Sequence, residues 1–283
     1  MNRAAVIGGG TMGLGIAYVM AQAGAEVAVV EPDDTRAAQM WEAIDGAAAG
    51  AVNRGKLSGE EAAALKGRIT RLTAIEALDD GLDLVVESVP ERFELKQSVL
   101  AAAAAREPAL LATNTSAISI DRLAERLSAP ECFLGMHFFN PVWSLKLVEL
   151  VRGAATSDDA IAAARSAVAW MGKEALVVRD VPGFATSRLD LIASLEAMRM
   201  LESGVASAED IDRAAVLAYR HPVGPLRLSD IVGLDVRLDI ARTLEAAHGA
   251  RFAPPKILET MVAEGKLGAK TGRGFFNWPN ASK

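Results

Sequence analysis

The stretch VIGGGTMG, residues 6–13, decides the fold of the first part of this chain. It lies between an apolar run and a helical stretch, and its glycines have the spacing G-x-G-x-x-G. Gly8 permits a tight turn, Gly10 lets the backbone approach a pyrophosphate, and Gly13 lets a helix pack closely on a strand. The N-terminus of that helix, with Thr11 and Met12, is expected to hold the phosphates of a dinucleotide. The alternative is a glycine-rich turn that binds no ligand.

An acidic residue follows the glycines at the distance that a ribose contact requires. Glu31 lies 23 residues after Gly8, at the end of the second predicted strand. A carboxylate at this point accepts hydrogen bonds from both ribose hydroxyls and repels the 2′-phosphate of NADP. We therefore expect NAD as the cofactor, with NADP as the alternative because Arg36 lies nearby.

Short β-rich apolar runs alternate with alanine-rich helical stretches as far as Gly183, a pattern typical of βαβ units around a parallel sheet. Ser58 followed by Glu61 predicts a capping box, and Asp33 or Asp34 precedes a long helix. The two helices within residues 34–67 are expected to form an αα-hairpin that projects from the sheet and lines a ligand. Strands are predicted at residues 3–7, 26–30, 82–87, 109–113, 133–138, 146–151 and 175–178.

Beyond Gly183 the apolar residues recur at helical spacing, and no strand is expected. The prediction is an α/β protein. Its Rossmann-like N-terminal domain, residues 1–183, carries the inserted αα-hairpin, and an all-α C-terminal domain, residues 184–283, follows. Wide apolar faces in so small a helical domain favour burial against a second copy, so we expect a homodimer. Helices are predicted around residues 189–201, 211–217, 234–244 and 257–262.

Composition argues against several classes of partner. A formal net charge of -6 over 283 residues disfavours nucleic acid and anionic lipid, which need a broad basic surface. No apolar stretch approaches the roughly 20 residues of a membrane helix, so no membrane segment is expected. The first residues enter a strand without a signal-peptide pattern, and the single Cys132 forms no intramolecular disulfide, which together predict a cytoplasmic protein. Three scattered histidines without metal-ligand spacing predict no metal site.

One histidine stands where the ligands of open α/β sheets gather. His137 closes a predicted strand, and ligands bind outside the carboxyl ends of such strands, so we expect it to act as an acid/base. Glu149 follows in the strand that would pair with it, and a carboxylate there fixes one ring nitrogen so that the other faces a substrate. The alternatives are a structural histidine and a lone charge on a sheet edge. His221 and His248 are expected to serve turns and helix ends.

Polar residues also follow the strand predicted at 109–113. Asn114, Thr115 and Ser116 lie directly after it and are candidates for contact with a ligand. The alternative is that one of them caps the helix that begins near Ile120.

Six motifs together resemble the 3-hydroxyacyl-CoA dehydrogenases, especially the short bacterial 3-hydroxybutyryl-CoA type. The resemblance covers essentially the whole chain in the right order, whereas the glycine pattern alone fits many dehydrogenases. The motifs are GGGTMG, NTSAISI, GMHFFNPVWSLKLVEL, PGFATSRL, HPVGPLRLSDIVGLD and KLGAKTGRGFFNW.

The resemblance implies roles for individual residues. His137 matches the general base and Glu149 the carboxylate that orients it, while Ser116 matches a serine that holds the substrate. Asn140 matches an asparagine near the nicotinamide and substrate. The resemblance also implies cofactor contacts for Glu91, Lys96 and Asn114, and a CoA contact for Lys270. Ser187 stands where the family has an asparagine, and is expected to contribute modestly to the catalytic site.

An acyl-CoA substrate requires local positive charge on this acidic protein. The insertion supplies Arg54, Lys56, Lys66 and Arg68, of which Arg54 and Lys56 are expected to hold the CoA phosphates. The alternative is that these are solvated surface charges. Two other functions stay open: a related dehydrogenase of a free hydroxy acid, such as a sugar acid or carnitine, and a protein that binds the cofactor without turnover.

Overall fold

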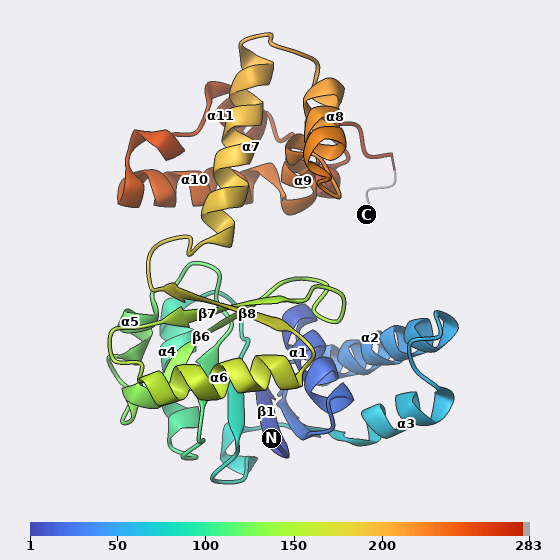
Figure 1. Ribbon diagram of the computed structural model, residues 1–283, viewed down its shortest axis with the longest axis vertical. Helices are drawn as coiled ribbons and strands as arrows, with labels where there is room; N and C mark the ends of the chain where they lie inside the picture. Colours follow the sequence, from blue (N-terminus) through green and yellow to red (C-terminus); the bar gives the residue numbers. More distant parts are fainter. Residues whose placement is uncertain (280–283) are drawn as a thin grey trace. The chain divides into compact units, whose positions relative to one another are not determined.

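The strands of residues 1–181 form one sheet that is parallel except at a single pair (Figure 1). The computed structural model describes residues 1–279, and the chain divides into two units between Val181 and Pro182. The strand order is β3-β2-β1-β4-β5-β6-β7-β8, and only β6 and β7 are antiparallel. The strands are β1 (Arg3–Ile7), β2 (Glu26–Val30), β3 (Ile69–Leu72), β4 (Leu84–Glu87), β5 (Leu111–Thr113), β6 (Phe133–Phe138), β7 (Leu147–Arg152) and β8 (Glu174–Arg179).

The strand order changes direction between β1 and β4, which confirms the predicted Rossmann-like topology. In such sheets the crevice for a ligand lies outside the carboxyl ends of the strands at this switch point. The glycine-rich stretch follows β1 directly and therefore lies at this edge.

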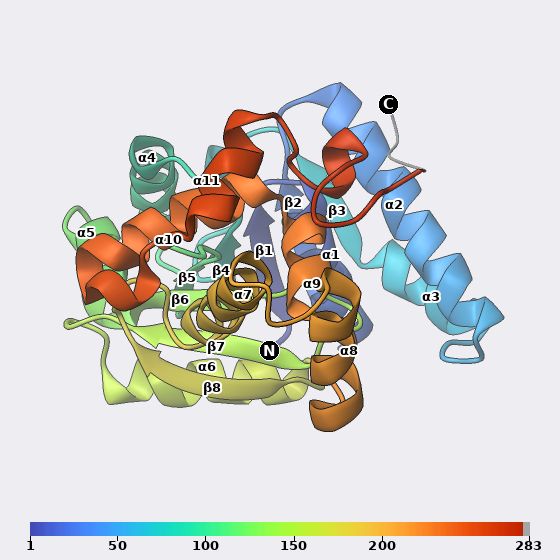
Figure 2. The ribbon, with the colours of Figure 1, turned by 90° about the horizontal axis from the view of Figure 1, so that it is seen from above.

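Helices cover both faces of the sheet (Figure 2). The helices α1 and α6 pack on one face, whereas α4 and α5 lie along the other. Two short 3₁₀ helices, η1 and η2, connect strands. Their bounds are α1 (Thr11–Gln22), α4 (Phe93–Ala104), α5 (Ile120–Ala124), α6 (Asp158–Trp170), η1 (Ile75–Ala77) and η2 (Pro130–Cys132).

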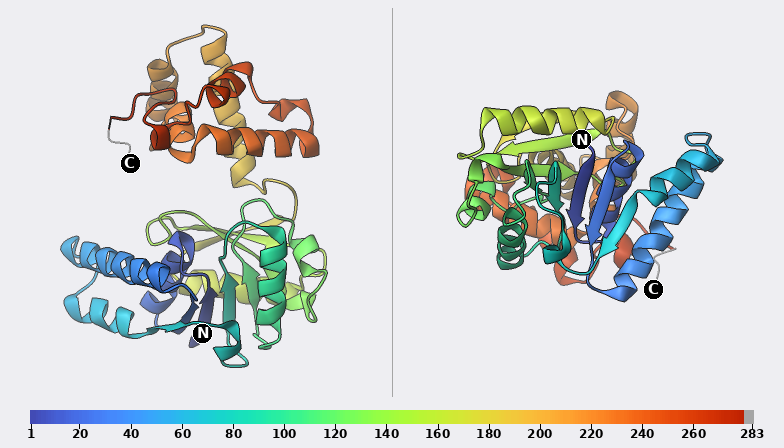
Figure 3. Two further views of the ribbon diagram at one scale, coloured as in Figure 1. Left: turned by 180° about the vertical axis from the view of Figure 1, so that it is seen from behind. Right: turned by 90° about the horizontal axis from the view of Figure 1, so that it is seen from below.

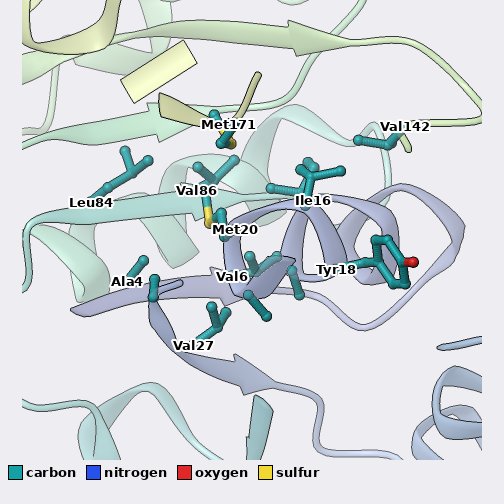
Figure 4. Close-up of a cluster of buried hydrophobic side chains, with 14 of the residues drawn as sticks. Ala4, Val6, Ile16, Tyr18, Met20, Val27, Leu84, Val86, Val142 and Met171 are labelled. Atoms are coloured by element: carbon teal, nitrogen blue, oxygen red, sulfur yellow. The ribbon is translucent and has the colours of Figure 1, made fainter. Parts of the chain in front are cut away.

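The largest cluster of buried side chains lies between α1, α6 and the sheet. Figure 4 shows Val6, Ile16, Met20 and Val86 gathered between α1 and the central strands, and all four are fully buried. Burial of such side chains contributes about 1.5–3 kcal/mol each to folding. This core fixes the helix that begins at the glycine-rich stretch against the strand that precedes it.

The predicted αα-hairpin is present and extends from the β3 side of the sheet (Figure 3). It consists of α2 (Asp34–Asn53) and α3 (Gly59–Gly67). The Asp33 side chain caps α2 by accepting a bond from the Arg36 backbone, and Ser58 forms the predicted capping box with Glu61. Both helix starts were therefore encoded locally.

The second unit is helical, as predicted. A buried cluster that includes Leu195, Met198 and Leu238 joins its helices. Among the described residues, no helix is long and apolar enough to cross a bilayer. The elements are α7 (Thr186–Glu202), α8 (Ala208–Tyr219), α9 (Pro225–Val232), α10 (Leu234–His248), α11 (Lys256–Ala263), η3 (Ala250–Phe252) and η4 (Ala269–Thr271).

The structure corrects the expected element list in two places. β3, at Ile69–Leu72, was not predicted, although it pairs in parallel with β2 and forms one edge of the sheet. α9, at Pro225–Val232, was also missed, and Asp212 on α8 accepts bonds from its first amides at 2.9 Å. β3 depends on pairing with β2, and the start of α9 depends on the Asp212 side chain. Both partners are more than ten residues away in the sequence.

Candidate active site

The glycine-rich turn has the shape that a pyrophosphate requires. Gly8 has φ of +107°, and a Cβ on Gly13 would lie 1.8 Å from the Gly8 carbonyl oxygen, so neither position accepts a side chain. Gly10, by contrast, faces open space, with no atom within 4 Å of an added Cβ. Gly10 is also the N-cap of α1 and provides no side-chain cap, which leaves the first amides, including those of Thr11 and Met12, for an anion. These features fit a bound dinucleotide.

The Glu31 carboxylate is fixed beside this turn. It is 3% exposed, and its two oxygens accept bonds from the backbone of Gly9 at 3.1 Å and Asp33 at 3.0 Å. Arg71 donates to the Glu31 carbonyl oxygen at 2.8 Å and pairs with Asp34 at 2.7 Å. The carboxylate therefore lies at the end of β2 in a defined orientation.

A buried ion pair lies at the carboxyl ends of β4 and β5. Lys96 is fully buried, and its Nζ lies 2.9 and 3.1 Å from the two carboxylate oxygens of Glu87. Thr113 donates to the same carboxylate at 2.6 Å, as does the Val89 backbone at 2.6 Å. Burial raises the pKa of Glu87, and the Lys96 ammonium and the other donors oppose that rise. Sequence analysis missed Glu87.

Lys96 also supports the segment that follows β5. Its Nζ donates to the Asn114 carbonyl oxygen at 3.1 Å and pairs with Glu91 at 3.4 Å. Glu91 in turn accepts bonds from the Thr115 hydroxyl and, at 3.1 Å, from the Ser116 backbone. Lys96 thus lies beneath Glu91 and Asn114, with no exposed surface of its own to offer a ligand.

The segment Asn114 to Ser116 is held in place rather than used as a helix cap. The Asn114 side chain accepts a bond from the Phe138 backbone at 3.0 Å and donates to the Ser88 hydroxyl at 3.3 Å. Ser119 instead caps α5, which excludes the capping alternative for the three residues before it. Ser116 stays exposed at the strand ends.

His137 and Glu149 face each other across the antiparallel pair. They occupy opposite positions in the β6–β7 register, and Nδ1 of His137 lies 2.8 Å from Oε2 of the fully buried Glu149. The other ring nitrogen, Nε2, lies 3.1 Å from the Ser116 hydroxyl oxygen. When Nδ1–H donates a hydrogen bond to the Glu149 carboxylate, the neutral ring presents the lone pair of Nε2 toward Ser116. This arrangement can take up or release a proton beside an exposed hydroxyl.

Comparison with known proteins identifies the family. Residues 3–181 match the family described as 3-hydroxyacyl-CoA dehydrogenase, NAD binding domain, and residues 183–278 match 3-hydroxyacyl-CoA dehydrogenase, C-terminal domain. The chain belongs to the 3-hydroxyacyl-CoA dehydrogenases. The resemblance drawn from the six motifs is therefore confirmed.

Relatives in this family match over nearly their full length. A 3-hydroxybutyryl-CoA dehydrogenase of Bradyrhizobium diazoefficiens is 39% identical over 99% of this chain and 97% of its own. One from Mycobacterium tuberculosis is 40% identical, with 98% of this chain and 99% of its own covered. The crystal structure of the (S)-3-hydroxybutyryl-CoA dehydrogenase PaaH1 from Ralstonia eutropha superposes with a TM-score of 0.93 at 35% identity, and covers 100% of both chains.

The remaining predicted site residues lie in three places. Asn140 is exposed, two residues after β6. Arg54 and Lys56 are exposed in the connection between α2 and α3. Ser187 and Lys270 belong to the second unit: Ser187 is half-buried in the first turn of α7, and Lys270 forms an ion pair with Asp235 at 2.6 Å.

The other basic residues of the insertion are engaged within the protein. Lys66 pairs with Asp45 at 2.6 Å, and Arg68 donates to the Ala21 carbonyl oxygen at 3.3 Å. His248 ends α10, and its Nε2 lies 2.9 Å from the Pro182 carbonyl oxygen, in the structural role expected for it. Residues 1–279 contain no cluster of His, Cys, Asp or Glu that could hold a metal ion.

Proposed function

We propose that the chain interconverts (S)-3-hydroxyacyl-CoA and 3-ketoacyl-CoA with NAD(H), and that it prefers short acyl chains such as 3-hydroxybutyryl-CoA. The observation that carries the proposal is His137, with Glu149 at 2.8 Å on one nitrogen and Ser116 at 3.1 Å on the other. The names of the 35–40% identical relatives support the CoA ester and the four-carbon acyl group.

The nicotinamide, when bound, supplies the hydride chemistry, and the protein supplies geometry and the proton. In the oxidative direction, Nε2 of His137 accepts the proton of the 3-hydroxyl group. Ser116, on the same side of the ring, donates to the substrate oxygen, and Asn140 helps to orient the reacting carbon. Glu149 stabilises the imidazolium that results. In the reductive direction His137 returns the proton to the ketone.

A proposed cofactor site accompanies the proposed acid/base, His137. The Glu31 carboxylate is proposed to accept hydrogen bonds from the hydroxyls of the adenosine ribose, so NAD(H) is the expected cofactor. Glu91 and Asn114 are the candidates for contact near the nicotinamide, with Lys96 as their buried support.

Arg54 and Lys56 are proposed to hold the CoA phosphates, since both are exposed on an acidic protein. Joint replacement by Ala should raise the KM for acetoacetyl-CoA and weaken its salt dependence, with little change for NADH. An unchanged KM at low salt would mean that both residues are solvated surface charges without a role in CoA binding. Lys270 is a weaker candidate for the same ligand, because Asp235 already neutralises it; this bond lowers the pKa of Asp235.

A homodimer is the proposed assembly, and the cytoplasm the proposed location. Large apolar side chains are exposed on α8, where Leu217 is 72% and Tyr219 77% exposed, and such exposure is typical of a surface that another chain covers. Light scattering at micromolar concentration tests the assembly: a monomer mass would contradict it.

The central experiment follows NADH oxidation spectrophotometrically. Acetoacetyl-CoA, longer 3-ketoacyl-CoA esters and free acetoacetate are compared as substrates, each with NADH and NADPH. We expect the highest kcat/KM with acetoacetyl-CoA and NADH. Turnover of free acetoacetate at similar efficiency would favour a dehydrogenase of free hydroxy acids. NAD binding without turnover of any ketoacyl substrate would indicate a binding protein.

A further inference from the structure

The loop between the two proposed catalytic strands is held by a buried lysine. This β6–β7 loop, residues 139–146, joins the strand that carries His137 to the strand that carries Glu149. Lys173, in the turn between α6 and β8, directs its Nζ to the carbonyl oxygens of Val142 at 2.5 Å and Leu145 at 2.7 Å. One ammonium therefore bridges two points of the loop, three residues apart.

The opposite side of the same loop packs on α1. Val142 is 1% exposed, and a Cβ added to Gly15 of α1 would lie 2.8 Å from its Cβ and Cγ2 atoms. The Trp143 ring lies 5.7 Å from the ring of Tyr18, also on α1. Figure 4 shows Val142 and Tyr18 at this contact. The loop is thus confined between Lys173 and the helix that begins at the glycine-rich turn.

Burial of the Lys173 ammonium costs free energy of desolvation, so stability alone is a poor reason for a lysine at this position. Lys173 is 9% exposed. Among residues 1–279, no carboxylate forms a salt bridge with its ammonium group. Burial lowers its pKa, which means that desolvation of the ammonium opposes folding. A buried charge whose hydrogen bonds go to neutral carbonyls is weak evidence for stabilisation. Its geometric effect on the loop is the more direct consequence.

The β6–β7 loop controls the contact between His137 and Glu149. The two strands are antiparallel, so the conformation of the connecting loop sets which residues stand opposite each other. A shift of one residue would turn Glu149 to the other face of the sheet. Asn140 lies inside the loop itself, so the same restraint acts on a proposed substrate contact.

We propose that Lys173 is a positioning residue for the acid/base pair: by fixing the β6–β7 loop against α1, it holds His137 on Glu149 and Asn140 at the strand ends. This inference rests on the proposed function, because the pair that it positions is the proposed acid/base. Lys173 itself touches neither of those two side chains. Its effect on turnover therefore passes through the residues that the loop positions, and His137 accounts for most of the expected loss in kcat.

The test replaces Lys173 by Met, which has a similar length and no charge. We expect kcat with acetoacetyl-CoA to fall by about 10- to 100-fold, the loss associated with a misplacement of about 1 Å, while KM for NADH changes by less than about threefold. In a His137→Gln background, Lys173→Met should change the residual rate by less than about twofold. Lys146→Met removes a charge from an exposed side chain of the same loop and is the matched control, with activity unchanged.

A second variant approaches the loop from its other side, should Lys173→Met fail to fold. Gly15→Ala places a methyl group against Val142 and should also lower kcat by about tenfold. Val142→Ala in the same chain removes the crowding and should restore kcat to within about threefold of the original. Neither change removes the Lys173 ammonium or the backbone carbonyl oxygens that it binds, so the pair tests the loop position itself.

Nuclear magnetic resonance of ¹⁵N-histidine-labelled protein gives a readout that needs no activity. The chain has three histidines, and the His137→Gln variant assigns the signal. We expect the bonded Nδ1 proton of His137 in the wild type and its loss or broadening in Lys173→Met. Full kcat and an unchanged signal in the variant, or a kcat loss that adds to that of His137→Gln, would overturn the proposal. An inactive wild type with this proton signal present would refute the proposed function and leave the positioning test intact.

Discussion

Two buried glutamates lie at the end of the sheet where the parallel strands have their carboxyl ends, and the two differ in the partners that surround them. Glu87 ends β4 and Glu149 lies in β7, and both are fully buried. Glu87 faces a permanent cation, Lys96, and every donor around it belongs to the protein interior. Glu149 faces His137, and the other ring nitrogen of His137 faces the exposed Ser116.

The Glu87 cluster is enclosed by the protein, whereas the Glu149–His137 pair reaches an exposed side chain. In the Glu87 cluster the buried carboxylate is paired with Lys96 and accepts further bonds from the protein, so its removal should damage the fold. In the Glu149 pair the second ring nitrogen of His137 contacts the exposed Ser116, so we expect removal of Glu149 to damage turnover. Buried charge alone therefore does not mark a catalytic group; an accessible second partner does.

The largest expected effect is on stability, at Glu87. Glu87→Gln leaves the Lys96 ammonium buried beside a neutral amide, and the free energy of unfolding should fall by about 3–5 kcal/mol. Urea denaturation followed by circular dichroism measures this loss. The double variant Glu87→Gln with Lys96→Met removes both charges and should regain part of it. A change below about 1 kcal/mol in the single variant would mean that the ion pair is not a structural element.

The next effect concerns turnover, at His137. His137→Gln should lower kcat by at least about a hundredfold, because a positioned acid/base contributes that much or more. Gln can still donate to Glu149, so the denaturation midpoint should move little. Glu149→Gln should also lower kcat, since the ring loses its orientation and its counter-charge. Steady-state kinetics with acetoacetyl-CoA provide the measurement, and retention of most activity by His137→Gln would refute the mechanism.

The smallest effects are expected at the two serines proposed to contact the substrate, Ser116 and Ser187. Ser116→Ala removes one hydrogen bond to the reacting oxygen, which corresponds to about tenfold in kcat. Ser187→Ala should cost less than about tenfold, because a water molecule can replace its hydroxyl. The same assay compares both variants, with Ser187→Asn as the reference for the family's usual residue. A loss at either serine equal to that of His137→Gln would assign it a direct role in proton transfer.

Features encoded by neighbouring residues were predictable from the sequence. The glycine spacing, the capping box at Ser58 and the hairpin of α2 and α3 each depend on residues within one or two turns. His137 and Glu149 were also found, since a short return of the chain pairs their strands.

Features completed by distant partners were not predictable in the same way. β3 has only four residues, ITRL, and its alternating polar residues gain strand structure only by pairing with β2. The Glu87–Lys96 pair joins a strand end to a helix, and the available signal was Lys96 itself, on the buried face that Leu100 and Ala103 continue at helical spacing. The Lys173 contact depends on backbone carbonyl oxygens of a loop about 30 residues earlier. Because every residue has such an oxygen, the sequence contains no signal for this contact.

The antiparallel step between β6 and β7 has a consequence for the order in which the molecule can assemble. His137 and Glu149 are 12 residues apart, whereas the glycine turn at Gly8 packs on Ser88, 80 residues away. Closing the shorter segment costs about 1.7 kcal/mol less in chain entropy, since this cost grows with the logarithm of segment length. The His137–Glu149 pair is thus a local contact that a growing chain can form from one hairpin, while the glycine turn has to wait for the 80 residues that separate Gly8 from Ser88.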